Sequence, residues 1–159
     1  MGTFYTNSDG LQQQYGTRKA SLAGKHSAGI SLNKHIVVDF DGVDLVDTGP
    51  VIDLSAARLP AGAYITAAIL YVKTTFTSGG AATLDVGTFK ASDGATALSI
   101  NGLIAASAVA GLTAGAVITG AGAQVNTLIA EDTYIVPTYN VAAFTAGRGR
   151  LIVTYRMGL

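Results

Sequence analysis

Residues 62–90, GAYITAAILYVKTTFTSGGAATLDVGTFK, restrict the possible fold of this chain more than any other stretch. Successive side chains of an extended strand point to opposite sides. One side carries Ile65, Ala67, Ile69 and Tyr71, and the other carries Tyr64, Thr66, Ala68, Leu70 and Val72. Both sides are largely apolar, so we expect one to pack in the core and the other to pack against a partner. Glycines 79 and 80 predict a tight turn into a second strand over residues 81–90, and therefore a β-hairpin.

The composition predicts a single all-β domain. The chain has 159 residues, of which 20 are glycine and only 13% are charged. This length is typical of one domain, and few strong helix formers other than alanine are present. The absence of cysteine excludes disulfides and thiol chemistry. A surface poor in charge suits a protein that another protein covers.

The formal net charge of zero hides an uneven distribution. Residues 1–35 carry +3, residues 36–132 carry −6 and residues 133–159 carry +3. Basic ends on an acidic middle favour contacts between copies, or with a neighbour of opposite charge. Neither basic block has the charge density of a nucleic-acid-binding arm, so we expect no nucleic-acid partner.

Residues 1–34 are predicted to form an extended N-terminal arm, and residues 35–159 a β-sandwich domain. The first segment is rich in Gly, Ser, Thr, Asn and Gln and shows neither helical nor strand periodicity. It has no apolar core of a secretory signal. Its aromatic side chains would be exposed to water unless the arm packs on a neighbouring copy.

Short strands are predicted along the rest of the chain, at residues 35–40, 51–54, 116–119, 133–139 and 149–157. Pro137 limits its strand to a sheet edge or a bulge. In the last strand Leu151, Val153, Tyr155 and Met157 form the buried face. These strands, separated by Gly and Asp turns, predict a β-sandwich with a jelly-roll topology.

The uncharged segment from Gly94 to Ala130 is predicted to hold the single short helix of the fold. Asn101 caps this helix, Gly111 ends it, and residues 120–123 follow as a flexible link. The apolar part, residues 103–119, is mostly alanine interrupted by Gly, Ser and Thr. We therefore expect no membrane span.

Candidate chemistry is sparse. Asp39, Asp41, Asp44 and Asp47 form the densest acidic cluster, but their spacing departs from an EF-hand, so a solvated turn is expected, with a calcium site as the alternative. His26 and His35 have no partner at metal-ligand spacing, and no nucleophile elbow is present. We therefore expect no enzymatic activity and no cofactor.

Several stretches resemble small structural proteins of tailed bacteriophages, in particular capsid decoration or cement proteins. They are TNSDGLQQQYGTRKA, LPAGAYITAAILYVKTTFTSGGAATLDVGTFKASD, INGLIAASAVAGL and YNVAAFTAGRGRLIVTYRM. The resemblance implies a β-sandwich protein, commonly trimeric, on the outer surface of the virion capsid. Its partners would be the major capsid protein and further copies of itself, and its role would be to stabilise contacts between capsid subunits.

The residues expected at such interfaces are aromatic side chains of the arm, one apolar face of the central strand and the arginines, which pair bidentately with carboxylates. They are Phe4, Tyr5, Tyr15, Arg18, Tyr64, Ala67, Ile69, Tyr71, Arg148, Arg150 and Arg156. Two other functions stay open. One is a phage tail or fibre-associated jelly-roll module that binds a receptor or glycan. The other is a small hydrolase or calcium-dependent carbohydrate module that uses the acidic cluster.

Overall fold

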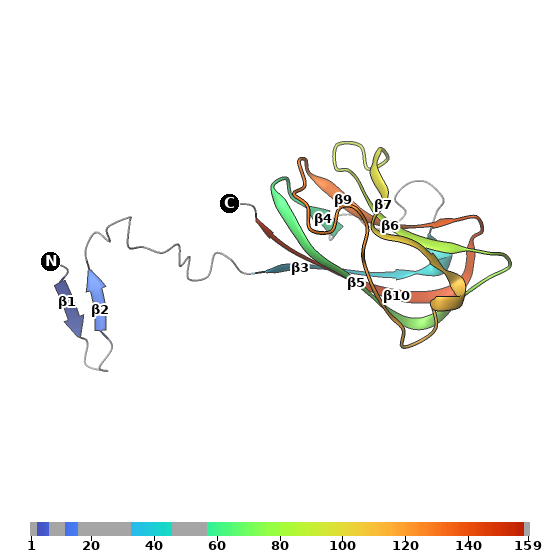
Figure 1. Ribbon diagram of the computed structural model, residues 1–159, viewed down its shortest axis with the longest axis horizontal. Helices are drawn as coiled ribbons and strands as arrows, with labels where there is room; N and C mark the ends of the chain where they lie inside the picture. The colour runs from blue at the N-terminus through green and yellow to red at the C-terminus, as the bar shows by residue number, and fades with distance from the viewer. Residues whose placement is uncertain (1–2, 7–11, 16–32, 46–56, 158–159) are drawn as a thin grey trace. The chain divides into compact units, whose positions relative to one another are not determined.

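The computed structural model describes residues 3–6, 12–15, 33–45 and 57–157 of the protein (Figure 1). The chain divides into two compact units, Met1–Ser31 and Leu32–Leu159. In the first unit β1 (Thr3–Thr6) pairs antiparallel with β2 (Gln12–Tyr15), with Thr3 opposite Tyr15. The contact role expected for residues 1–34 stays a prediction.

The second unit is a sandwich of two antiparallel sheets, which confirms the predicted all-β fold (Figure 1). One sheet has the order β3-β10-β5-β8 and the other β4-β9-β6-β7. Its strands are β3 (Lys34–Asp41), β4 (Arg58–Leu59), β5 (Ala63–Ser78), β6 (Thr83–Lys90), β7 (Ala97–Ala108), β8 (Val117–Thr119), β9 (Thr133–Asn140) and β10 (Phe144–Met157). The first strand of the sandwich lies beside the last, and most connections cross between the sheets, as in a jelly roll.

Both strands predicted within residues 62–90 are present, but the predicted hairpin is wrong. β5 and β6 belong to different sheets and do not pair. Gly79, Gly80 and Ala81 of their connection are exposed, and the chain then enters the second sheet at Ala82, which is 1% exposed. A sandwich lets the apolar sides of the two strands, with Leu70 on one and Leu84 on the other, meet across the core.

A β-bulge changes which side chains of β5 share a face. Ala67 lies opposite Thr154 and Ile65 lies opposite Tyr155, so Thr66 is an additional residue in β5. The bulge turns Ile65 into the core together with the even-numbered residues that follow it. The sequence predicts Ile65 on the same side of the strand as Ala67, and the structure corrects that prediction.

The predicted short helix is also wrong. Residues 97–108 form strand β7, and the described residues that follow it contain one short 3-10 turn, η3 (Val109–Gly111), while another, η1 (Gly42–Asp44), follows β3. Alanine favours a helix only weakly, and sheet pairing overrides this preference. Leu103 and Ile104 are both buried because β7 shifts register against β6 near this point.

Residues 120–124 hold the two sheets together and are not the flexible link that the sequence predicts. The Gly120 amide donates to Ala68 of β5 (2.7 Å), whereas the Gly122 amide donates to Leu103 of β7 (3.1 Å). The Gln124 side-chain oxygen accepts a 2.8 Å hydrogen bond from the Thr88 hydroxyl of β6. This segment therefore closes one side of the sandwich.

The strands predicted at residues 35–40, 116–119, 133–139 and 149–157 are confirmed as β3, β8, β9 and β10, whereas residues 51–54 lie outside the described residues. β9 lies between β6 and β4. On the β6 side Pro137 lies opposite Val86, whereas β4 pairs only with residues 133 and 134, so no described strand lies beside Pro137 on the β4 side. Met157 is exposed, not buried as predicted. In the part of the chain that the structure describes, no helix has the length and apolarity needed to span a membrane.

Candidate functional site

The outer face of the β3-β10-β5-β8 sheet gathers several of the residues expected at an interface. The strands pair in register, so residues of four strands form rows across the sheet. One row is Val37–Ile152–Ile69–Thr119, and the next is Asp39–Arg150–Tyr71–Val117. The inward neighbours of these residues fill the core, so the rows themselves face away from it.

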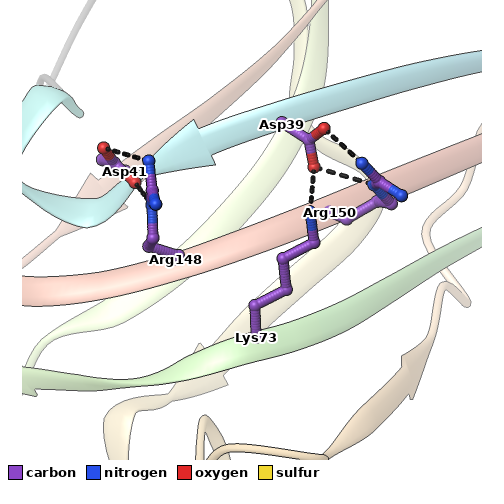
Figure 2. Close-up of polar contacts among 5 residues, drawn as sticks. All are labelled: Asp39, Asp41, Lys73, Arg148 and Arg150. Carbon is purple, nitrogen blue, oxygen red and sulfur yellow. Dashed lines mark hydrogen bonds and ion pairs between the residues drawn. The ribbon is translucent and has the colours of Figure 1, made fainter.

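Five charged side chains, which we call the ionic cluster, cover one end of this face: Asp39, Asp41, Lys73, Arg148 and Arg150 (Figure 2). Asp39 on β3 accepts two hydrogen bonds from Arg150 on β10 (2.8 and 2.7 Å) and one from Lys73 on β5 (2.9 Å). Asp41 accepts hydrogen bonds from Nε and Nη2 of Arg148, one on each carboxylate oxygen. The cluster thus connects three neighbouring strands.

The hydrogen bonds from Arg150, followed by the one from Lys73, hold the pKa of Asp39 well below its usual range. The carboxylates raise the pKa of Arg148 and Arg150 in turn. These side chains are one third to two thirds exposed, so each pair contributes little stability on its own. The cluster therefore matters mainly for the alignment of the strands.

Replacing Asp39 by Asn should lower the free energy of unfolding at neutral pH by at most about 1 kcal/mol, the upper range for exposed ion pairs. Because the pKa of Asp39 is depressed in the folded state, its stabilisation is complete above the unfolded pKa of about 3.9 and is lost as the pH falls through the folded value. The difference between the two proteins should therefore shrink on acidification, as measured by urea unfolding at about pH 7 and pH 2.5.

Asp44→Asn is the matched control, because Asp44 forms no ion pair with a described residue. It should change the free energy of unfolding less than Asp39→Asn does at neutral pH. A loss of stability in Asp39→Asn that grows as the pH falls would contradict the assigned ion pairs.

A surface depression of about 490 Å³ lies beside the ionic cluster. Its lining comprises Asp39, Phe40, Asp41, Asp44, Lys73, Arg148 and Gly149. A calcium ion at this position would require the carboxylate oxygens of Asp39 and Asp41 as ligands. These oxygens instead accept hydrogen bonds from the Lys73 ammonium and from the Arg148 and Arg150 guanidinium groups. Within the described residues no three acidic, His or Cys side chains group as a metal site, and Asp47 lies outside them. The geometry therefore favours ion pairing at this position over calcium binding.

An apolar group, which we call the apolar patch, lies next to the ionic cluster on the same face. Its exposed members are Val37 (45%), Tyr71 (40%) and Val117 (57%), with half-buried Ile69 and Ile152 between them. It extends from β3 at one edge of the sheet to β8 at the other. Apolar side chains that cross a whole sheet face are typical of a surface that a partner covers.

The structure brings together five of the residues expected at interfaces. Ala67, Ile69 and Tyr71 lie on the outer face of β5, and Arg148 and Arg150 join the ionic cluster beside them. Arg150 and Tyr71 are direct neighbours across the strands. The arginines were expected to pair with carboxylates of another chain, and the structure adds that they pair within their own.

The other expected interface residues belong to neither the ionic cluster nor the apolar patch. Arg156 sits over the ring of Tyr64, 5.1 Å from its centroid, in a cation–π contact. Phe4 and Tyr5 belong to β1 and Tyr15 to β2, whereas Arg18 lies outside the described residues. The assignment of all these residues to an interface stays a prediction.

Sequence reasoning missed the partners of the arginines and three of the five residues of the apolar patch. Asp39 and Asp41 are two residues apart in β3, and Arg148 and Arg150 are two residues apart in β10. This matching two-residue spacing is a signal for paired strands once the first and last strands are known to be neighbours. Val37, Ile152 and Val117 lie on three different strands, and no local pattern marks them as one surface.

A scan against protein-family models and a search of curated proteins found no match. Among solved structures, a chain from the capsid of Ralstonia phage GP4 is similar, with 26% identity and a TM-score of 0.51. The similarity covers 79% of this chain and 86% of that chain. Chains from an acidic stable capsid of Helicobacter pylori bacteriophage KHP30 and from the capsid of cyanophage Pam1 are 16% and 18% identical, each with a TM-score of 0.52.

Each of these comparisons covers 79% of this chain, and 87% and 84% of the KHP30 and Pam1 chains. The KHP30 and Pam1 chains show that the fold is shared. The GP4 chain, with its higher identity over most of both lengths, supports a structural, non-enzymatic role in a bacteriophage virion.

Proposed function

We propose that the protein is a capsid decoration protein, which binds the outer surface of a phage head and stabilises contacts between major capsid protein subunits. The observation that carries this proposal is the similarity to a phage capsid chain over 86% of that chain's length. The matching region is about the size of the sandwich, so a protein of similar extent serves in that capsid.

The outer sheet face supports the proposal because it offers a surface suited to another protein. The apolar patch crosses the whole sheet, and in the ionic cluster beside it three cations pair with two carboxylates, so the net charge of the cluster is only +1. A partner therefore needs few charges of its own at this face. The described lining of the adjacent depression contains no histidine, serine or cysteine, and so no nucleophile with its base.

Stabilisation would follow from mass action. A protein that binds the assembled shell, and not free subunits, makes disassembly costlier by its binding free energy. Many copies on one head add their contributions. We further propose that the protein acts as a homotrimer, as its resemblance to decoration proteins implies.

The test begins with the mass of the purified protein in solution, measured by light scattering, where three chains are expected. The protein is then incubated with phage heads stripped of their decoration and sedimented with them. Protein that pellets with heads and raises their resistance to heating supports the proposal. Protein that does not sediment with heads, but attaches to tails or cell-surface glycans, supports the tail or fibre function instead.

A further inference from the structure

The two sheets end in four strands, and three of these edges are short or covered. β4 has two residues and β8 has three. β7 receives hydrogen bonds from the amides of Gly122 and Gln124. β3 differs, because it runs for eight residues in unbroken register with β10, and no described segment bonds to its other side.

An open edge of this length presents unpaired N–H and C=O groups that accept another strand. Proteins usually block such edges with proline, bulges or several lysines. β3 contains no proline and no bulge, and its one lysine, Lys34, is its first residue. Its side chains alternate regularly between the core and the outer face. The strand is thus regular enough to pair along its length.

We propose that β3 pairs antiparallel with β3 of a second copy of this chain, about a twofold axis at Val37. The two four-stranded sheets would then form one continuous sheet of eight strands. In an antiparallel pair opposite residues share a face, so outward residues must meet outward residues. Centring the pair on Val37 places Val37 opposite itself and His35 opposite Asp39.

The side chains of β3 fit this register. Val37 is 45% exposed, and its counterpart in the second copy would cover it. The Nδ1 atom of His35 bonds to the Thr154 hydroxyl (3.1 Å), which leaves Nε2 for a partner. Oδ2 of Asp39 accepts one hydrogen bond, from Arg150 (2.7 Å), and has a second lone pair to offer.

Neighbouring registers are worse. A pair centred on Val38 sets Val37 against Asp39, and one centred on Ile36 sets Val37 against His35. Each places an apolar side chain opposite a polar one. The register centred on Val38 replaces the His35–Asp39 match by His35 opposite Asp41, and is worse because of the Val37–Asp39 mismatch. Complementary groups across the strand pair therefore select the register centred on Val37.

This contact goes beyond the proposed function and does not depend on it. A single strand pair is a small interface, so we expect it to be weak between free molecules. Copies held close together would experience a high effective concentration and would pair readily. Because each chain offers one β3 edge, twofold pairs would join separate oligomers into a net.

Disulfide trapping of purified protein tests the pairing, and the absence of native cysteine makes any introduced thiol unique. In Val37→Cys the two Cα atoms would lie about 4.5–5.5 Å apart, within the range of about 4.4–6.8 Å for disulfides. We expect Val37→Cys to form a crosslinked dimer at least about tenfold faster than Val43→Cys, whose site on η1 is also exposed, because pairing raises the effective thiol concentration.

A second measurement fixes the register. An equal mixture of His35→Cys and tagged Asp39→Cys proteins should give mainly the mixed dimer, since these positions face each other and neither faces itself. Equal rates for Val37→Cys and Val43→Cys would overturn the pairing. If His35→Cys alone crosslinks as fast as the mixture, the proposed register is wrong. Neither measurement uses phage heads, so its failure is distinguishable from failure of the decoration function.

Discussion

Replacing Gly87 by Ala is expected to lower the free energy of unfolding by about 3 kcal/mol or more, the upper range for overpacked sites. Gly87 lies in β6, where β7 passes directly over it. A Cβ atom here would collide with the carbonyl oxygens of Ser99 and Ile100. These are backbone atoms in a paired strand, so they have little freedom to move aside. Urea unfolding, followed by far-ultraviolet circular dichroism, measures the effect.

Gly111→Ala provides the matched control. A Cβ atom at Gly111, in the exposed turn η3, meets no atom within 4 Å. The same substitution there should change the free energy of unfolding by no more than about 0.5 kcal/mol. Equal effects at both positions would show that β7 does not pass over Gly87 as closely as the structure places it.

Replacing Val117 by Asp is expected to weaken attachment to phage heads by at least about a hundredfold, because burying an unpaired carboxylate costs several kcal/mol. This prediction assumes the proposed function and an interface on the apolar patch. Val117 is 57% exposed, so the sandwich itself should tolerate the change. Titration of stripped heads followed by sedimentation gives the affinity.

Val141→Asp makes the same chemical change away from the apolar patch, in the turn between β9 and β10. Val141 has a φ of 73°, a conformation that Asp adopts more readily than Val, so the control should fold at least as well as the native protein. It should bind heads normally. If both variants bind like the native protein, the apolar patch is not the contact surface.

The strands were predictable wherever a local period of two is complete. Leu151, Val153 and Tyr155 alternate with neighbours that are polar except for Ile152, and β10 follows from them directly. The jelly-roll topology was also expected, from the number and spacing of short strands. These features depend on residues that are close together in the sequence, and a periodic pattern of apolar residues records such local relations.

The failures share a different cause, since each depended on contacts distant in sequence. The bulge at Thr66 exists because β5 must match β10, some ninety residues away. The segment around Leu103 reads as a helix by its alanines, but pairing with β6 makes it a strand. The ionic cluster escaped notice for the same reason, because Asp39 and Arg150 meet only after the chain has folded.

The neighbouring positions of β3 and β10 also determine when the sandwich is able to form. Asp41 and Arg148 are 107 residues apart in sequence, yet they face each other in adjacent strands. Because β3 pairs with β10, which the ribosome makes last, β3 stays without this pairing during most of the synthesis. Its apolar side chains remain exposed to solvent for that time. Contacts of such long range make folding slow, on a scale of about milliseconds to seconds. Cells producing the protein in quantity would therefore hold a pool of nascent chains that are vulnerable to aggregation until β10 is complete.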